Sequence, residues 1–155
     1  MMKIQWKKLI VSLVIPLAVG GLSALLTREG MERFSEVQKP PLAPPAWLFP
    51  VAWTILYVLM GVAAYLIWVA PHPFTLQFAA YGTQLFFNFF WSLIFFNLKN
   101  DLFAFVWLVF LWLFILLTVL LFRRNDRTAA WLMVPYLVWV TFAGYLNLGI
   151  YLLNR

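Results

Sequence analysis

The residues of this chain that could do chemistry are amides, hydroxyls and aromatic rings that recur at helical spacing inside long apolar stretches. In one stretch the polar side chains recur every three or four residues, at Gln77, Tyr81, Gln84, Asn88 and Ser92. At about 100° per residue, these five lie on one face of a helix. Polar side chains are costly in lipid and tend to face a bundle interior or a cavity. The pattern therefore predicts an inward-facing polar stripe.

Each of the other apolar stretches carries a similar stripe of small, hydroxyl-bearing or large aromatic residues. The stripes are Ser12, Pro16, Ser23 and Thr27; Trp53, Tyr57, Ala64 and Trp68; Trp107, Phe114 and Thr118; and Tyr136, Trp139, Ala143 and Asn147. Two interpretations stay open. Small residues and amides can bring helices together with no ligand. Alternatively, Trp and Tyr with a few amides can wall a cavity for a flat, largely apolar ligand.

Other kinds of reactive site are missing from the sequence. There is no Cys and a single His, His72, which lies between two prolines, so we expect neither a metal site nor thiol chemistry. The expected spans contain no Asp, Glu, Lys or Arg, which disfavours proton-coupled antiport. We find no nucleophile–base pair, paired carboxylates or glycine-rich phosphate loop. No obligatory cofactor is expected, and any reaction would depend on a bound chromophore.

The composition points to a membrane environment. Of the 155 residues, 65% are hydrophobic and 10% are charged, against about 25% charged residues in a soluble domain. A soluble globular enzyme and a disordered chain are both excluded. The net charge is +6, and the charged residues lie at the edges of the apolar stretches. Anionic lipid headgroups, rather than nucleic acid, are therefore the expected partner of these charges.

The elements that must position the inward side chains are five predicted transmembrane helices. Residues 40–98 contain no formally charged side chain. This segment is much longer than the roughly 20 residues of one membrane span, so it is expected to hold two helices, separated by Pro71 and Pro73. The predicted spans are 9–27, 46–69, 74–98, 102–122 and 128–153. Asp126 is expected to cap the last one. The predicted fold is an all-α membrane protein, a five-transmembrane-helix bundle in one domain over residues 1–155.

The first span and the orientation each have an alternative. Three lysines before an apolar stretch also describe a signal peptide, but this stretch is long for one and is interrupted by Pro16 and Gly20-Gly21. The amino-terminal side of the bundle carries six Lys and Arg residues, and the opposite side carries five. The positive-inside rule therefore favours a cytoplasmic amino terminus by a margin of one residue.

The longest connection, residues 28–45, is expected to form a lid. Its charged first part predicts a short surface helix, and the proline-rich segment 40–45 predicts a stiff, extended chain near polyproline II. Such a segment can lie across the mouth of a bundle, whereas a plain connector is the alternative. Long loops are often functional. The predicted lid residues are Pro40, Pro41, Leu42 and Pro44.

Three motifs along the chain resemble the signatures of one family. The first motif consists of Lys39-Pro40-Pro41, Pro44-Pro45-Ala46-Trp47, Pro50-Val51-Ala52-Trp53-Thr54-Ile55-Leu56-Tyr57 and Met60-Gly61. The second consists of Gln84-Leu85, Asn88, Trp91 and Ile94-Phe95-Phe96. The third consists of Pro135-Tyr136-Leu137-Val138-Trp139, Phe142-Ala143 and Leu146-Asn147. In this order and spacing they resemble the tryptophan-rich sensory protein (TspO/MBR) family, which includes the mitochondrial translocator protein, also called the peripheral benzodiazepine receptor.

The resemblance implies a five-helix bundle, commonly a homodimer, with a pocket that opens toward one membrane face under the loop 28–45. The ligands it implies are porphyrins such as protoporphyrin IX, sterols in eukaryotic members, and benzodiazepine-type drugs. Carried over by motif position, the ligand-binding residues are Trp53, Tyr57, Asn88, Trp107, Trp139, Ala143 and Asn147. A bacterial cell membrane is the implied location.

The resemblance leaves several functions open. Some bacterial members are thought to promote light-dependent breakdown of bound porphyrin, and Trp53 and Trp139 would then be the catalytic electron donors. We expect a membrane receptor that binds porphyrin. A porphyrin photo-oxidase, a transporter of porphyrin or lipid, and a structural partner in a membrane complex are the alternatives.

Two further patterns are degenerate. Leu148, Tyr151 and Arg155 loosely fit the family's sterol motif, for which an interfacial Tyr and a terminal Arg anchor are the alternative. Ala79 and Thr83 have the small-xxx-small spacing of a helix dimer contact. Packing within the bundle would also explain that spacing.

Overall fold

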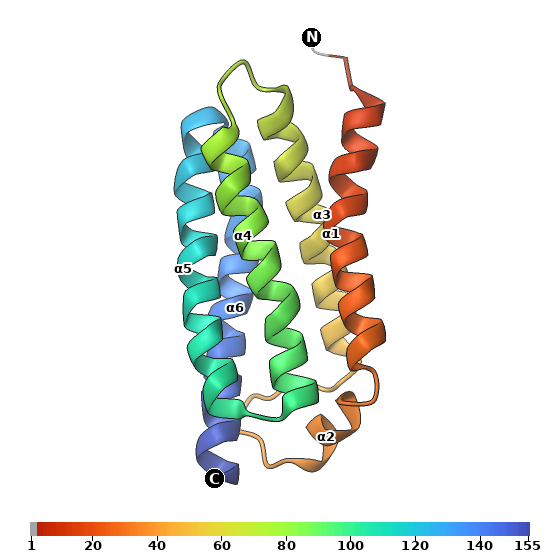
Figure 1. Ribbon diagram of the computed structural model, residues 1–155, viewed down its shortest axis with the longest axis vertical. Coiled ribbons are helices and arrows are strands. Elements are labelled where there is room, and N and C mark those ends of the chain that lie inside the picture. Colours follow the sequence, from red (N-terminus) through yellow and green to blue (C-terminus); the bar gives the residue numbers. More distant parts are fainter. Residues whose placement is uncertain (1–2) are drawn as a thin grey trace.

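The computed structural model describes residues 3–155, apart from the side chain of Arg33, and most of them lie in helices (Figure 1). The elements are α1 (Trp6–Thr27), α2 (Met31–Glu36), α3 (Leu48–Val69), α4 (Thr75–Ser92), the π-helix η1 (Leu93–Leu98), α5 (Asp101–Asn125) and α6 (Arg127–Asn154). Residues 3–155 contain no strand. The prediction of an all-α protein is confirmed.

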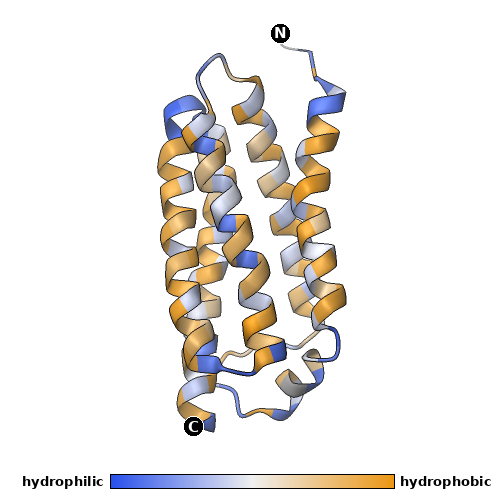
Figure 2. Ribbon diagram, in the orientation of Figure 1, coloured by the Kyte–Doolittle hydropathy of each residue, from blue (hydrophilic) through white to orange (hydrophobic). Residues whose placement is uncertain are grey.

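Four helices, α1, α3, α5 and α6, are long and apolar enough to cross a membrane. Apolar residues cover most of their length, and hydrophilic residues gather at both ends of the bundle (Figure 2). Helices of this kind identify an integral membrane protein. The span predicted at 74–98 divides into α4, which has 18 residues, and the six-residue η1 that follows it.

The long helices run side by side and leave the two chain ends at opposite ends of the bundle (Figure 1). Along the ring, α1 packs on α3, α3 on α6, α6 on α5, α5 on α4 and α4 on α1. The residues that α1 buries are Ser12, Pro16, Ser23 and Thr27. The buried face of α4 includes Gln77, Tyr81, Gln84 and Asn88. The inward stripes predicted for these two helices are therefore confirmed.

Side-chain caps and prolines set the helix boundaries. The Asp126 carboxylate accepts a hydrogen bond from the Ala129 amide at 3.0 Å, which confirms the predicted cap of α6. The Asn100 side chain caps α5 in the same way, through the Phe103 amide at 3.1 Å. At the end of α3, Ala70 takes an extended conformation with ψ of 144°, as expected for a residue that precedes a proline.

The connection 28–45 is partly as predicted. The short surface helix exists as α2, but residues 41 and 42 form a turn, and Leu42 has a φ of 72°. The prediction of a continuous extended segment over residues 40–45 is therefore wrong at Leu42. The physical reason is anchoring: Tyr145 donates a 2.7 Å hydrogen bond to the Pro41 carbonyl, so the chain is held on α6 and must change direction to reach α3.

Candidate functional site: an aromatic cavity beside helix α1

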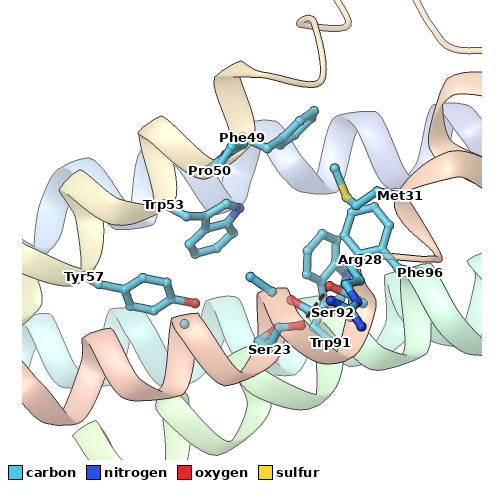
Figure 3. A pocket seen from close by; sticks show the side chains of 13 residues that line it. Ser23, Arg28, Met31, Phe49, Pro50, Trp53, Tyr57, Trp91, Ser92 and Phe96 are labelled. Atoms are coloured by element: carbon cyan, nitrogen blue, oxygen red, sulfur yellow. Dashed lines mark hydrogen bonds between the residues drawn. The ribbon is translucent and has the colours of Figure 1, made fainter.

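A cavity of about 260 Å³ lies between α1, α3, α4 and η1 at the end of the bundle that carries α2 (Figure 3). Its lining consists of Gly20, Ser23, Ala24, Thr27, Arg28, Met31, Phe49, Pro50, Trp53, Tyr57, Trp91, Ser92 and Phe96. Ligand pockets commonly have about 300–1,000 Å³. This cavity lies just below that range and is partly open, so a large ring system would extend beyond it.

The walls of the cavity follow from helical spacing. On α3, Pro50, Trp53 and Tyr57 lie at i, i+3 and i+7 and face the cavity together (Figure 3). On α1, the small residues at 20, 23, 24 and 27 share one face and leave the space that the large rings enclose. The Trp53 and Tyr57 rings stack with centroids 5.6 Å apart. This arrangement suits a flat apolar group inserted against the rings.

The cavity has few free polar groups. The Thr27 hydroxyl donates to the Ser23 carbonyl at 2.8 Å, so it is occupied within α1. Among the lining residues, Arg28 is the charged one, and its guanidinium lies beside Ser92 and Trp91 (Figure 3). A guanidinium next to an apolar chamber favours a ligand that joins an apolar ring system to a carboxylate.

A buried hydrogen-bond chain supports the cavity wall from behind. Tyr57 donates to the Asn88 side-chain oxygen, Asn88 donates through its amide nitrogen to the Tyr136 hydroxyl, and Tyr136 donates to the Gln84 side-chain oxygen, each at 2.7 Å. Gln84, Asn88 and Tyr136 are at most 1% exposed. The chain joins α3, α4 and α6 and fixes the direction of Tyr57. Both side-chain heteroatoms of Asn88 are engaged within it.

A second pair of bonds holds the opposite wall. The Trp91 indole N–H donates to the Asn147 side-chain oxygen at 3.1 Å, and the Asn147 amide nitrogen donates to the Asp101 carbonyl at 2.9 Å. The Trp91 ring also stacks on Phe95, with centroids 5.2 Å apart. Asn147 therefore orients a cavity ring from α6 without belonging to the lining.

The structure places the seven predicted ligand-binding residues at different depths. Trp53 and Tyr57 line the cavity, and Asn88 and Asn147 lie behind its walls. The Trp139 ring contacts Trp53 at a centroid distance of 6.4 Å, and its buried indole N–H has no partner among residues 3–155. Ala143 is buried in the core.

Trp107 lies apart from this group. Its indole N–H donates to the Phe87 carbonyl at 2.8 Å, and its ring packs on the Phe87 ring at 4.4 Å. These contacts belong to the surface between α4 and α5, away from the cavity lining. The structure therefore does not bring Trp107 together with Trp53 and Tyr57.

Sequence reasoning missed most of the cavity wall that comes from α1 and from the start of the connection 28–45. The small face of α1 was recognised as inward through Ser23 and Thr27, but it lies outside the three family motifs. No sequence pattern marks Arg28 and Met31 as cavity residues, because their place in the lining depends on how the chain turns after α1. Trp91 and Phe96 were within the second motif and were available as candidates.

The connection 28–45 packs on this end of the bundle through several buried residues. Phe34 of α2 is 3% exposed and packs on Phe49 and Phe96, with ring centroids at 5.0 and 6.4 Å. Pro40 is buried against Gly149, where a Cβ atom would come 2.5 Å from the proline ring. Of the other predicted lid residues, Pro41 is bound to Tyr145, Pro44 is half-buried, and Leu42 is 85% exposed.

The remaining predicted residues lie on the outside of the bundle. Ala79 is exposed, and the Thr83 hydroxyl donates to its carbonyl at 2.7 Å within α4. Tyr151 and Arg155 border a shallow depression at the carboxyl-terminal end, while Leu148 is exposed on α6. Among residues 3–155, no three His, Cys, Asp or Glu side chains gather as metal ligands.

Comparison with known proteins decides the family. Residues 12–153 match the model of the TspO/MBR family. The chain belongs to this family. The match includes every residue that lines the aromatic cavity.

Relatives within the TspO/MBR family come from all three domains of life. The chain is 38% identical to the tryptophan-rich protein TspO of Archaeoglobus fulgidus over 95% of its own length and 97% of the relative. It is 37% identical to the tryptophan-rich sensory protein of Cereibacter sphaeroides, over 99% and 95% of the two chains. It is 34% identical to the bovine translocator protein, over 86% and 82%.

Proposed function

We propose that this TspO/MBR protein is a membrane receptor that binds porphyrin-type ligands in the cavity between α1, α3 and α4. The observation that carries the proposal is the pairing of stacked rings, Trp53 and Tyr57, with one guanidinium, Arg28, at the edge of the cavity. A porphyrin is flat and apolar and bears carboxylates on one side. The rings would stack on the macrocycle, and Arg28 would bind a carboxylate.

The proposal includes five membrane spans. α4 and η1 together cover 24 residues, from Thr75 to Leu98, or about 36 Å at a helical rise of 1.5 Å per residue. The hydrocarbon core of a bilayer is about 30 Å thick. The amides of α4 lower its hydropathy, visible as hydrophilic bands midway along it (Figure 2), but they face the bundle interior, so a lipid-facing surface of Leu and Phe remains. A bacterial cell membrane and a cytoplasmic amino terminus complete the proposed arrangement.

A homodimer through α4 fits the same arrangement. The exposed Ala79 lies on the outer side of α4, and a Cβ atom at neighbouring Gly82 would meet nothing within 4 Å. This outer face, with Thr83, would allow a second copy to approach closely. Crosslinking of Ala79→Cys protein in membranes tests the dimer separately from ligand binding.

The test of the receptor function is a titration with protoporphyrin IX in detergent, in the dark, read by quenching of Trp fluorescence. Trp53→Leu should weaken binding about tenfold, since it removes a stacking ring worth about 0.5–1.5 kcal/mol beyond its buried area. Trp131→Leu is the matched control, because Trp131 is 71% exposed and lies near the start of α6, away from the cavity. Equal binding by both variants and the parent protein would refute the assigned cavity.

The role of Arg28 has its own comparison. Arg28→Gln should weaken binding of protoporphyrin IX but leave binding of its dimethyl ester unchanged, because the ester has no carboxylate. Arg124→Gln removes an exposed charge at the other end of the bundle and should affect neither ligand. A similar loss for acid and ester would mean that Arg28 only shapes the lid.

A second candidate function is light-dependent degradation of the bound porphyrin. It is favoured by the edge contact between Trp53 and Trp139, which provides a second electron donor 6.4 Å from the first. Trp53 would donate one electron to the photoexcited macrocycle, which would pass it to dioxygen to give superoxide. The macrocycle would then return one electron to the Trp53 radical, and the porphyrin radical cation so formed would combine with superoxide, so that the macrocycle is oxidised and dioxygen is the oxidant. Illumination of the complex with and without dioxygen tests this. Bleaching no faster than that of free porphyrin, or unchanged in Trp53→Phe and Trp139→Phe protein, would exclude it.

A further inference from the structure

A second hollow, here called the α5–α6 groove, lies at the opposite end of the bundle from the aromatic cavity. It has about 350 Å³ and is formed by the last turns of α5 and the first turns of α6. Arg123, Arg127 and Trp131 lie along it, together with four apolar residues between Val119 and Val134. This end of the bundle also carries the amino terminus (Figure 1). Neither the family motifs nor the aromatic cavity includes any of these residues.

Two arginines line the groove from different helices. Arg123 lies in the last turn of α5, and Arg127 is the first residue of α6. The carboxylate between them in sequence, Asp126, accepts a hydrogen bond from the Ala129 amide at 3.0 Å and so is held at the helix cap. Asp126 is also the single carboxylate in residues 102–155. Paired guanidiniums are suited to bind a phosphate through several charge-assisted hydrogen bonds.

Below the arginines the groove is apolar. Arg127 and Val134 are seven residues apart on α6, and Arg123 and Val119 are four apart on α5, so the apolar lining extends about 6–10 Å beyond the charges at 1.5 Å per residue. Trp131 is 71% exposed, the placement of an indole at a membrane–water interface. A charged rim that continues into an apolar channel matches the junction of a phospholipid headgroup with its acyl chains.

The distribution of charge between the two ends supports an anionic partner on this side. The end with the groove has six Lys and Arg residues and one carboxylate, whereas the opposite end has five Lys and Arg residues and four carboxylates. The field at the groove is therefore strongly positive, and the opposite end is nearly neutral. Basic pockets between transmembrane helices bind the headgroups of anionic lipids.

We propose that the α5–α6 groove is a binding site for an anionic phospholipid, with the phosphate between Arg123 and Arg127 and an acyl chain along Val119 and Val134. A free phosphate would use the arginines and leave the apolar channel empty. The continuity of charged rim and apolar channel therefore favours the lipid. The proposal does not depend on the ligand of the aromatic cavity.

The test is native mass spectrometry of the protein released from detergent, titrated with phosphatidylglycerol, phosphatidylcholine or glycerol phosphate. The parent protein should bind one phosphatidylglycerol in preference to phosphatidylcholine, and glycerol phosphate should not compete. R123Q/R127Q should weaken phosphatidylglycerol binding roughly tenfold. K7Q/R124Q removes the same charge at the same end of the bundle but leaves the groove intact, so it should bind as the parent does.

A second variant tests the apolar channel while keeping both arginines. Leu120→Trp places a larger side chain at a lining position that is 52% exposed, so the fold should tolerate it. The indole would fill part of the apolar channel, so phosphatidylglycerol binding should fall. Equal weakening in R123Q/R127Q and K7Q/R124Q would overturn the proposal in favour of diffuse surface attraction. Competition by glycerol phosphate, with no effect of Leu120→Trp, would overturn it in favour of a phosphate site.

Discussion

Tyr57 both lines the cavity and begins the buried hydrogen-bond chain, so Tyr57→Phe separates these two roles. The phenyl ring would keep its stacking on Trp53, but the 2.7 Å bond to Asn88 would be lost. The Asn88 side-chain oxygen, in a residue 1% exposed, would then lose its partner. We expect Tyr57→Phe to reduce stability while leaving porphyrin affinity within about twofold, because the stacking surface is retained.

The size of the stability loss follows from the environment of the bond. In water-soluble proteins an unsatisfied buried group costs about 1–3 kcal/mol, whereas hydrogen bonds between membrane helices average about 0.6 kcal/mol with a maximum near 1.7. We therefore expect the free energy of unfolding to fall by about 1 kcal/mol, a roughly fivefold change in the unfolding equilibrium. The measurement is reversible unfolding in mixed detergent–SDS micelles, followed by near-ultraviolet circular dichroism.

Tyr145→Phe is the matched control, since it removes a phenol hydroxyl that bonds the exposed Pro41 carbonyl rather than a buried amide. It should change bundle stability by less than Tyr57→Phe does. The reasoning is refuted if Tyr57→Phe protein keeps its full stability and loses porphyrin binding. That result would mean that the Tyr57 hydroxyl turns toward the ligand and that the chain through Asn88 does not support the wall.

Three further predictions follow from single contacts. Gly20→Ala places a Cβ atom against the Tyr57 ring, so porphyrin affinity should fall at least threefold. At neighbouring Gly21 a Cβ atom would meet nothing within 4 Å, so Gly21→Ala protein should bind porphyrin normally in the same titration. Gly149→Val should displace Pro40 from α6 and speed hydrogen exchange of residues 31–42 about tenfold or more; unchanged exchange would show that other contacts hold the connection 28–45 on the bundle. Asp126→Ala removes the cap of α6 and should lower stability by about 1 kcal/mol in the unfolding assay, an effect that Asp126→Asn should largely avoid.

The helices and their inward faces could be predicted from the sequence because lipid imposes a simple rule. Apolar stretches of sufficient length must be helical, and polar side chains within them must turn inward. The stripe from Gln77 to Asn88 is buried for this reason. The Asp126 cap was also predictable, because a cap depends on a few neighbouring residues.

The site was less predictable, because periodicity gives the direction of a side chain but not what it meets. Asn88 and Asn147 point inward as expected, yet each is consumed by hydrogen bonds to neighbouring helices. Trp107 satisfies its indole N–H with a backbone carbonyl of α4. The turn at Leu42 depends on the anchoring of Pro41 by Tyr145, residues 104 positions apart, and no local pattern encodes such a contact.

The same polar residues that hold the bundle together also give the cavity its shape. Two amide side chains of α4, Gln84 and Asn88, form hydrogen bonds with Tyr136 at the bundle centre. This chain begins at Tyr57 in one cavity wall, and in the opposite wall the Trp91 indole N–H donates to the Asn147 side-chain oxygen. Each wall therefore has an aromatic ring that is oriented by an amide on another helix. The cavity beside the small residues of α1 stays open because these rings cannot collapse into it without breaking buried hydrogen bonds. Amides shared between helices can therefore keep a cavity preformed, even where its lining offers a single charged side chain, Arg28.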